Sequence, residues 1–379
     1  MVIIAIPKET AEHERRVALV PETVAKLTEK GLEVRVEANA GHSSNYPDSA
    51  YEEAGAQIQP DRDKLFTEAD ILISIQAPNE EDLKRMKPGS ILICFLWALQ
   101  NEKIVHLLQE KKITALGMDA VPRISRAQNM DALSSMSSIS GYKAALIGAN
   151  ELDRYLPMMM TAAGTIAPSK VLVLGAGVAG LQAIATSKRL GAVVEAFDVR
   201  PVVKEQVESL GAKFVEVPDL DEDSETKGGY AKELSEDKQE RQRQVIHEHA
   251  KKSDIIITTA LIPGKPAPLL ITKEMVRDMH PGAVIVDLAA EQGGNCELTE
   301  PGKAMVLNGV KILGPLNLPS QLAHHASQLY SKNMLALLNH LLKDGKPEFN
   351  FEDEITRSTT ITHEGKIISP MLKENSKSE

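Results

Sequence analysis

The sequence contains few aromatic residues, few cysteines and no excess of positive charge. Aromatic residues make up 3% of its 379 residues, with Trp97 as the single tryptophan, which argues against a stacking platform for single-stranded nucleic acid. Two cysteines, Cys94 and Cys296, are too few for a disulfide framework or a cysteine-based zinc site. A formal net charge of −10, without a basic arm or stripe, argues against a duplex nucleic-acid binder. We therefore expect no nucleic-acid partner and two reduced thiols.

Long hydrophobic runs are also absent. The longest apolar stretches, such as residues 91–99, reach about half of the ~20 residues that a transmembrane helix needs. The first residues, MVIIAIPKE, lead directly into a strand pattern and lack the basic start and small-residue cleavage site of a signal peptide. We expect a soluble, intracellular protein.

Apolar residues (42%) and charged residues (25%) are present in the proportions of a globular protein with a large core. Short apolar runs alternate with amphipathic helical stretches along most of the chain. The first series of strands is expected at residues 2–6, 32–37, 69–75, 90–95 and 113–117. A second series is expected at residues 171–174, 193–197, 213–217, 254–258, 283–287 and 310–313. This alternation predicts an α/β protein with two Rossmann-like, doubly wound parallel-sheet domains separated by a cleft.

The two series set the expected domain boundaries. We assign residues 1–135 together with 320–379 to the first Rossmann-like domain, and residues 136–319 to the second. Long helices are expected over residues 132–156, joining the domains, and over residues 319–342, returning to the first domain. These helices offer apolar faces for a homodimer.

Residues 219–252 interrupt the alternation inside the second domain. They begin with a cluster of acidic residues and continue through two glycines to Tyr230. An insertion of this length is typical of a functional lid or a disordered loop, and we expect a mobile loop over residues 219–245. His247 and His249, two residues apart on a helix, would point to different sides. We therefore expect them on a solvated face and predict no metal.

The strongest local signal is the segment VLVLGAGVAG. Gly175, Gly177 and Gly180 form a G-x-G-x-x-G pattern between a strand and a helix, and Asp198 closes the next strand. Such glycines permit a tight turn, a close approach of backbone N–H groups to a pyrophosphate, and close helix–strand packing. Asp198 would accept hydrogen bonds from the adenosine ribose and repel a 2′-phosphate, so NAD(H) is favoured over NADP(H). Arg200 is the one feature nearby that weakens this preference.

The equivalent turn of the first domain has a different character. Its sequence, IPKETAEHERRVALVPE, is charged and lacks glycine. We therefore expect this domain not to bind a dinucleotide phosphate and instead to face the nicotinamide end.

Several motifs together resemble a known family, the NAD(H)-binding component (domain I) of proton-translocating nicotinamide nucleotide transhydrogenases. The motifs are PKE, ERRVALVPE, RISRAQNMDALSS, PMMMTAAGT, GAGVAGLQAIATSKRLGA, GGYAKE, TTALIPGKPAP and EQGGNCELTEPG. The similarity extends over nearly the whole chain. The chain also resembles alanine dehydrogenase, a related enzyme with the same two-domain fold.

The comparison with alanine dehydrogenase depends on two positions. That family uses a lysine and a histidine to bind and protonate its oxo-acid, and here the matching residues are Gln76 and Trp97. Oxidative deamination needs a proton shuttle, whereas hydride exchange between two nicotinamides needs only two rings at near-attack distance. These residues therefore favour the transhydrogenase interpretation. Arg16 remains where alanine dehydrogenases bind a carboxylate, so that alternative stays open.

The resemblance implies a catalytic role for the segment RISRAQNMDALSS. It assigns Asp131 and Ser134 to the nicotinamide carboxamide, Gln128 to a contact with the partner's nucleotide, and Arg123 to stiffening the loop and bonding NAD(H). Without the resemblance, the arginines would be interpreted as a solvated turn and Asp131 as a helix N-cap.

The resemblance also implies further contacts with NAD(H). Besides the three glycines and Asp198, the implied cofactor-binding residues are Val178, Val199, Arg200, Gly229, Tyr230, Gln242, Ala260 and Leu261. Tyr230 is expected either to close over the ligand or to contact the partner.

These observations predict the NAD(H)-binding subunit of a transhydrogenase, made as a separate chain. The NADP(H)-binding domain and the membrane-spanning subunits, with the proton channel, would lie on other polypeptides. The subunit would be cytoplasmic and peripheral on the inner face of the cell membrane. The alternatives are an alanine dehydrogenase-like enzyme and a non-catalytic NAD(H)-sensing module.

Overall fold

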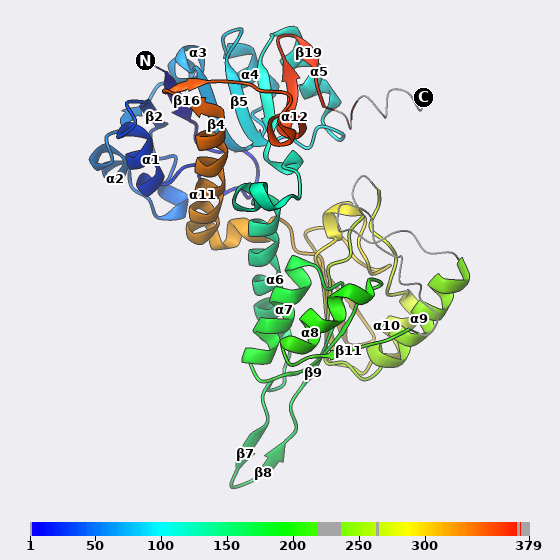
Figure 1. The fold of residues 1–379 in the computed structure, drawn as a ribbon. Helices are drawn as coiled ribbons and strands as arrows, with labels where there is room; N and C mark the ends of the chain where they lie inside the picture. The colour runs from blue at the N-terminus through cyan, green and yellow to red at the C-terminus, as the bar shows by residue number, and fades with distance from the viewer. Residues whose placement is uncertain (1, 218–235, 263–264, 370–371, 373–379) are drawn as a thin grey trace. The chain divides into compact units, whose positions relative to one another are not determined.

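A computed structural model describes residues 2–217, 236–262, 265–369 and 372 of the chain. The chain divides into two compact units, which we describe separately: a first unit of residues 1–136 with 319–379, and a second unit of residues 137–318. Each unit is built around one large sheet (Figure 1). Among the described residues, no helix is both long and apolar enough to span a membrane.

The first unit contains an eight-stranded sheet in the order β19-β18-β6-β5-β4-β1-β2-β3. Its parallel strands are β1 (Ile3–Ile6), β2 (Glu33–Glu37), β3 (Gln57–Gln59), β4 (Ile71–Gln76), β5 (Ile91–Phe95) and β6 (Thr114–Gly117). The hairpin β18 (Thr360–His363) and β19 (Lys366–Ile367) extends the sheet beside β6 in the antiparallel sense. The strand order reverses between β1 and β4. This reversal is the topological switch point of a doubly wound sheet.

Helices of the first unit cover the sheet and bury its apolar runs. They are α1 (Pro21–Thr28), α2 (Asp48–Glu53), α3 (Arg62–Glu68), α4 (Glu80–Arg85), α5 (Glu102–Glu110), α11 (Ala323–Leu341) and α12 (Glu354–Thr359). Short 3-10 helices and a small hairpin complete it: η1 (His42–Ser44), η2 (Met118–Ala120), η3 (Ser125–Met130), η6 (Leu318–Leu322), β16 (Leu342–Lys343) and β17 (Lys346–Pro347). Helix α11 is half apolar and buries Tyr330, whose hydroxyl donates to the carbonyl of Ser74 on β4. Helix α11 therefore belongs to the core of the first unit.

The second unit contains a seven-stranded sheet, β11-β10-β9-β12-β13-β15-β14, whose first five strands in sequence have the same order as those of the first sheet. Its strands are β9 (Lys170–Leu174), β10 (Val193–Phe197), β11 (Lys213–Phe214), β12 (Ile255–Thr258), β13 (Val284–Asp287), β14 (Ala304–Leu307) and β15 (Val310–Leu313). Its helices are α7 (Val178–Arg189), α8 (Lys204–Ser209), α9 (Glu236–Ala250), α10 (Lys273–Asp278), η4 (Pro201–Val203) and η5 (Ala290–Gln292). Only β14 is antiparallel to its neighbour.

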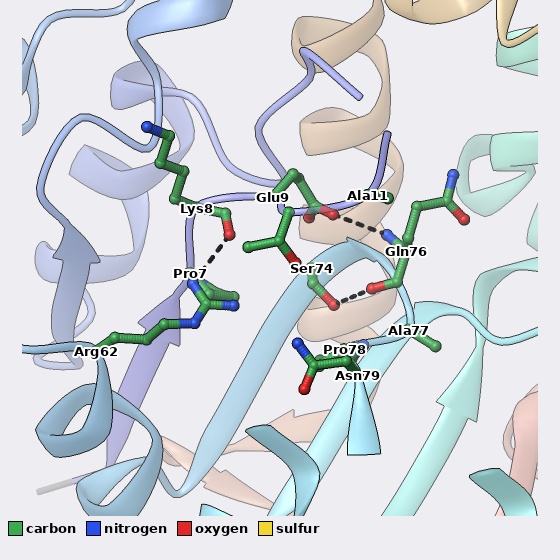
Figure 2. A pocket seen from close by; sticks show the side chains of 11 residues that line it. Pro7, Lys8, Glu9, Ala11, Arg62, Ser74, Gln76, Ala77, Pro78 and Asn79 are labelled. Carbon is green, nitrogen blue, oxygen red and sulfur yellow. Dashed lines mark hydrogen bonds between the residues drawn. The ribbon is translucent and has the colours of Figure 1, made fainter. Parts of the chain in front are cut away.

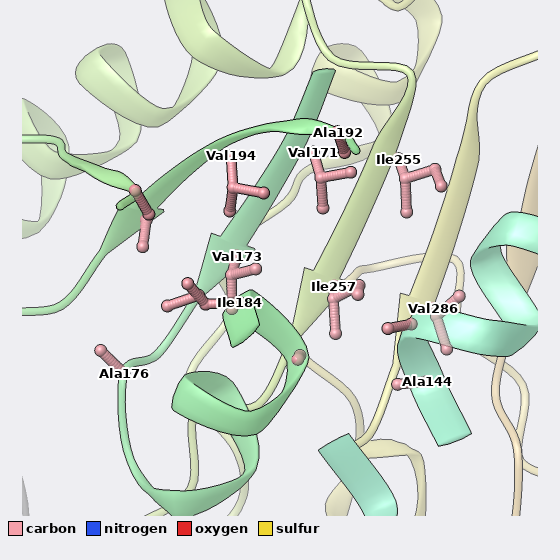
Figure 3. Close-up of a cluster of buried hydrophobic side chains, with 14 of the residues drawn as sticks. Ala144, Val171, Val173, Ala176, Ile184, Ala192, Val194, Ile255, Ile257 and Val286 are labelled. Atoms are coloured by element: carbon pink, nitrogen blue, oxygen red, sulfur yellow. The ribbon is translucent and has the colours of Figure 1, made fainter. Parts of the chain in front are cut away.

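The central strands of this sheet are apolar on both faces because helices cover both. Val171, Val173, Ile255 and Ile257 point to one face and pack with Ile184 of α7 (Figure 3). Leu172, Leu174 and Ile256 point to the other face. Such continuous β-branched and aliphatic runs are typical of buried parallel strands. The predicted α/β class, with two mostly parallel sheets, is confirmed, and both sheets are mixed at one edge.

Some predicted bounds were wrong. Helix α6 spans Ala132–Glu151 and ends before the chain forms a hairpin of β7 (Met159–Thr161) and β8 (Gly164–Ile166), which extends from the second unit. Strand β11 is two residues long rather than five. His247 and His249 are half-buried on α9, and their rings bond the carboxylates of Asp278 and Glu195 respectively.

Candidate functional site

The turn between β9 and α7 shows why it needs its glycines. Gly175 has φ +100°, in the left-handed region, and a Cβ on Gly180 would lie 1.8 Å from the carbonyl oxygen of Gly175. A Cβ on Gly177 would find no atom closer than the Nη2 of Arg200 at 4.0 Å. Gly180 therefore permits the packing of helix on strand, while Gly177 leaves open space above the turn. Val178 is 42% exposed beside that space.

Asp198 lies at the end of β10, next to this turn. One carboxylate oxygen accepts the Ala176 N–H at 2.7 Å and the Nη2 of Arg200 at 2.9 Å. The other accepts the backbone N–H and the Nε of Arg200, both at 2.9 Å. Asp198 is thus buried and hydrogen-bonded to the glycine turn. The Arg200 side chain bonds Asp198 directly. Val199, the residue between Asp198 and Arg200, is half-buried.

The segment after β12 lies against the same turn. The backbone N–H of Thr259 donates to the Leu174 carbonyl at 2.8 Å, and its hydroxyl donates to the Gly175 carbonyl at 3.0 Å. Ala260 and the 38% exposed Leu261 follow directly. The ends of β9, β10 and β12 therefore bring most of the predicted cofactor residues to the carboxyl edge of one sheet, where ligands of doubly wound folds bind.

Two further predictions concern α9 and the segment before it. Gln242 is buried on α9. Gly229 and Tyr230, and most of the predicted mobile loop, lie outside the described residues, so their expected role stays a prediction.

The predicted catalytic segment belongs to the first unit and consists of η3 and the first turn of α6. Asp131 caps α6: one carboxylate oxygen accepts the Ser134 N–H at 2.8 Å, and the other accepts the Ser134 hydroxyl at 2.6 Å. The structure thus brings Asp131 and Ser134 together. Gln128 and Arg123 are exposed, on η3 and just before it. The capping role and the role implied by the resemblance are compatible, because a carboxylate oxygen accepts more than one hydrogen bond.

Sequence analysis missed the residues that hold η3 in place. The Nδ2 of Asn333, on α11, donates to the Asn129 carbonyl at 2.9 Å, and Arg126 pairs with Asp353 at 3.0 Å. The Oδ1 of Asn333 is buried and has no hydrogen-bond partner among the described residues. These contacts join residues more than 200 positions apart in the sequence, so no local sequence pattern predicts them.

A cavity of about 380 Å³ lies at the switch point of the first unit, where β1 and β4 end (Figure 2). Glu9 lines it, and its carboxylate accepts the backbone N–H groups of Ile75 at 2.6 Å and Gln76 at 3.3 Å. Burial raises the pKa of Glu9 to about 8, against the lowering effect of these two hydrogen bonds. The remaining lining residues are Pro7, Lys8, Thr10, Ala11, Arg62, Ser74, Ala77, Pro78 and Asn79.

The arginine that alanine dehydrogenases would use is engaged within the first unit. Arg16 is 4% exposed and forms a two-pronged ion pair with Glu14, with Nε and Nη2 at 2.7 and 2.6 Å from the two carboxylate oxygens. Burial alone would raise the pKa of Glu14, but the Arg16 guanidinium outweighs it and holds that pKa at about 2. Gln76 donates to the same carboxylate at 3.2 Å. Trp97 has φ +47° and stacks on Phe95.

The described residues contain no group of three or more His, Cys, Asp or Glu side chains arranged to hold a metal ion. Cys94 and Cys296 are both buried free thiols, and burial raises the pKa of each.

Comparison with known proteins gives the family. The family model "Alanine dehydrogenase/PNT, C-terminal domain" matches residues 144–370, and the corresponding N-terminal domain matches residues 5–140. The chain belongs to the alanine dehydrogenase/PNT family. It is 51% identical to the first of the alpha-subunit chains of NAD(P) transhydrogenase from Rhodospirillum rubrum, over 97% of this chain and 98% of that protein.

Two further comparisons separate the branches of the family. The crystal structure of a transhydrogenase from Sinorhizobium meliloti superposes with a TM-score of 0.88 at 44% identity, covering 97% of this chain and all of that one. An alanine dehydrogenase of Halomonas elongata is 28% identical over 96% of this chain and 94% of its own length. The predicted resemblance to the transhydrogenase subunit is confirmed.

Proposed function

We propose that this chain is the NAD(H)-binding subunit of a proton-translocating transhydrogenase and supports direct hydride transfer from NADH to NADP+ on a partner domain. The observation that carries the proposal is the contrast between an intact dinucleotide turn at Gly175–Gly180 and the residues Gln76 and Trp97 where a proton shuttle would stand. Neither an amide nor an indole moves protons near neutral pH.

The turn of the second unit fits a dinucleotide. The space above Gly177, bounded by Arg200, is where backbone N–H groups can approach a pyrophosphate at the start of α7. Asp198 would accept the ribose hydroxyls in competition with Arg200, and Val178, Val199, Ala260 and Leu261 would contact the remaining parts of NAD(H). Residues 136–319 would form this binding domain, and residues 1–135 with 320–379 the domain that faces the nicotinamide.

Hydride transfer between two nicotinamides converts NADH and NADP+ into NAD+ and NADPH without a net proton. The chain therefore contributes binding, orientation and exclusion of water rather than acid–base chemistry. Asp131 and Ser134 would bond the carboxamide and fix the ring face, Gln128 would contact the partner's nucleotide, and Arg123 would stiffen the segment.

The same proposal includes the assembly. The chain would act as a homodimer, bound to the NADP(H)-binding domain and the membrane-spanning subunits at the cytoplasmic face of the membrane. Those subunits would couple hydride transfer to proton movement. The identity over nearly the full length of the Rhodospirillum rubrum alpha-subunit chain supports this arrangement.

A stopped-flow experiment tests the function. Purified chain with NADH is mixed with the isolated partner domain carrying NADP+, and L-alanine with NAD+ serves as the second assay. We expect NADPH formation only when the partner is present, and no turnover of alanine. Alanine turnover without transfer to the partner would instead identify an amino-acid dehydrogenase.

Variants separate a catalytic subunit from an NAD(H) sensor. Asp131→Asn or Gln128→Asn should slow hydride transfer strongly while NADH affinity changes little. Asp344→Asn, the same exchange in an exposed turn with φ +48°, is the matched control and should transfer hydride at the wild-type rate. If only NADH affinity responds to Asp131→Asn, the sensing module is the better account.

A further inference from the structure

The segment after β12 is held by an asparagine to which neither the sequence analysis nor the proposed function assigns a role. Asn295 is fully buried. Its Nδ2 donates to the carbonyls of Ala260 at 2.9 Å and Pro268 at 2.8 Å, and its Oδ1 accepts the Ala260 N–H at 3.0 Å. One side-chain amide thus pairs with both backbone groups of Ala260, as a neighbouring strand would.

Asn295 is itself fixed to the sheet through Asp287, the last residue of β13. The buried Asp287 carboxylate accepts hydrogen bonds from the backbone N–H groups of Ala289, Asn295 and Cys296 and from the hydroxyls of Thr258 and Thr299, at 2.6–3.0 Å. Thr258 is the last residue of β12 and lies opposite Asp287 in the sheet register. The ends of two central strands therefore determine where the Asn295 amide stands.

On its other side, the same segment touches the glycine turn. The hydroxyl of Thr259 donates to the Gly175 carbonyl, and a Cβ on Gly175 would lie 2.6 Å from that hydroxyl oxygen. Ala260 is thus bracketed between the turn and Asn295. A shift at either side changes the distance between the turn and the Ala260–Leu261 backbone.

We propose that Asn295 is a positioning residue for NAD(H) binding: it sets the place of Ala260 and Leu261 relative to the glycine turn. The inference rests on the proposed function, because it requires that these residues contact the cofactor. A buried amide with all its hydrogen bonds made fixes one geometry, whereas an apolar side chain of the same size would only fill the space. Asn295 does not touch the reacting atoms in this account.

Asn295→Asp tests the inference with little change of shape. A carboxyl group carries at most one proton, so at least one of the two carbonyls of Ala260 and Pro268 loses its donor. We expect the Kd for NADH, measured on the full chain from nicotinamide fluorescence, to rise about tenfold, the scale of one lost buried hydrogen bond. Asn308→Asp, the same exchange in the exposed turn between β14 and β15, should leave the Kd within about twofold of wild type.

Urea unfolding of the same samples separates positioning from stability. A purely structural role would lower the unfolding midpoint of Asn295→Asp and leave the Kd of the folded protein unchanged, which would overturn the inference. Thr259→Val, which removes the contact with Gly175 while keeping the shape, gives a second test and should weaken NADH binding in the same direction. Wild-type affinity in both variants would also overturn it. If the wild-type chain itself fails to bind NADH, the proposed function fails first.

Discussion

The two units place different loops at the same point of the same topology. In each sheet the strand order reverses between the first strand and the fourth, and the loop after the first strand lies at that switch point. In the second unit this loop is the glycine turn, with open space above Gly177. In the first unit it is a charged loop in which Glu14 and Arg16 form a buried ion pair and Glu9 accepts backbone hydrogen bonds. Topology therefore supplies a place for a ligand at each switch point, and the residues there decide its chemistry: a glycine turn in the second unit, and charged side chains beside a cavity in the first.

The largest effect should come from adding a side chain inside the glycine turn of the second unit. Gly180→Ala puts a Cβ 1.8 Å from the Gly175 carbonyl oxygen, so α7 must move away from β9. We expect NADH affinity to fall by at least ~100-fold, or about 3 kcal/mol of binding free energy. Titration of NADH fluorescence measures it.

Gly177→Ala is the comparison for that variant, because the added Cβ meets no protein atom closer than 4.0 Å. It should fold with wild-type stability and still bind NADH more weakly, since the methyl group occupies the space proposed for the pyrophosphate. Equal NADH affinity of Gly177→Ala and wild type would contradict that placement.

The next largest effect should come from removing the buried ion pair in the charged loop of the first unit. Glu14→Gln leaves the buried Arg16 guanidinium without its countercharge, and losing one partner of a buried pair costs about 3–5 kcal/mol of unfolding free energy. Urea denaturation of the full chain measures the loss. NADH affinity of the folded protein should stay within about twofold of wild type, because the residues proposed to hold the pyrophosphate and the ribose of NAD(H) belong to the second unit.

Glu22→Gln controls for the exchange itself. Glu22 pairs with Lys26 on the exposed face of α1, and such a pair contributes less than about 1 kcal/mol. If Glu14→Gln destabilises the chain no more than Glu22→Gln does, the loop of the first unit is not held by its charges.

The two loops also differ in how far the sequence predicts them. Gly175, Gly177 and Gly180 form a local pattern between a strand and a helix, and Asp198 follows the next strand, so their place in the fold and the role proposed for them can be predicted from spacing. The bonds from Asn333 to Asn129 and from Asn295 to Ala260 connect distant segments, and the sequence around an asparagine does not indicate which backbone group its side chain meets.

Element bounds follow the same division. Apolar runs predict the central strands because both faces are buried. In contrast, β11 pairs over only two residues at one edge of its sheet, β14 pairs antiparallel at the other edge, and the hairpin β18–β19 extends the sheet of the first unit in the antiparallel sense. Edge strands such as β11, β14 and β19 pair with a neighbour on one side only, so their apolar runs are short. The hairpin after α6 was missed because Met159–Ile166 is exposed and shows no buried periodicity.

The pH dependence of stability tests the protonation state of Glu9 in the charged loop of the first unit. The pKa of Glu9 is raised to about 8, mainly by burial, from 4.5, so the folded state keeps its proton where the unfolded chain has lost it. The stability that Glu9 contributes is complete below about pH 4.5 and is lost as the pH rises to about 8. Glu9→Gln cannot ionise, so its urea midpoint should fall less than that of wild type between pH 5 and 8. Parallel profiles of the two proteins would mean that Glu9 is ionised throughout.

The smallest effect concerns the preference for NADH over NADPH beside the glycine turn. The Arg200 guanidinium bonds both oxygens of Asp198 and offsets the charge that would repel a 2′-phosphate. Arg200→Gln should therefore increase the ratio of NADH to NADPH affinity about threefold to tenfold, the scale of a partly exposed charge interaction. Competition of NADPH against bound NADH measures the ratio, and Arg189→Gln, at the far end of α7, is the control for lost positive charge. An unchanged ratio in Arg200→Gln would mean that Asp198 excludes NADP(H) regardless of its partner.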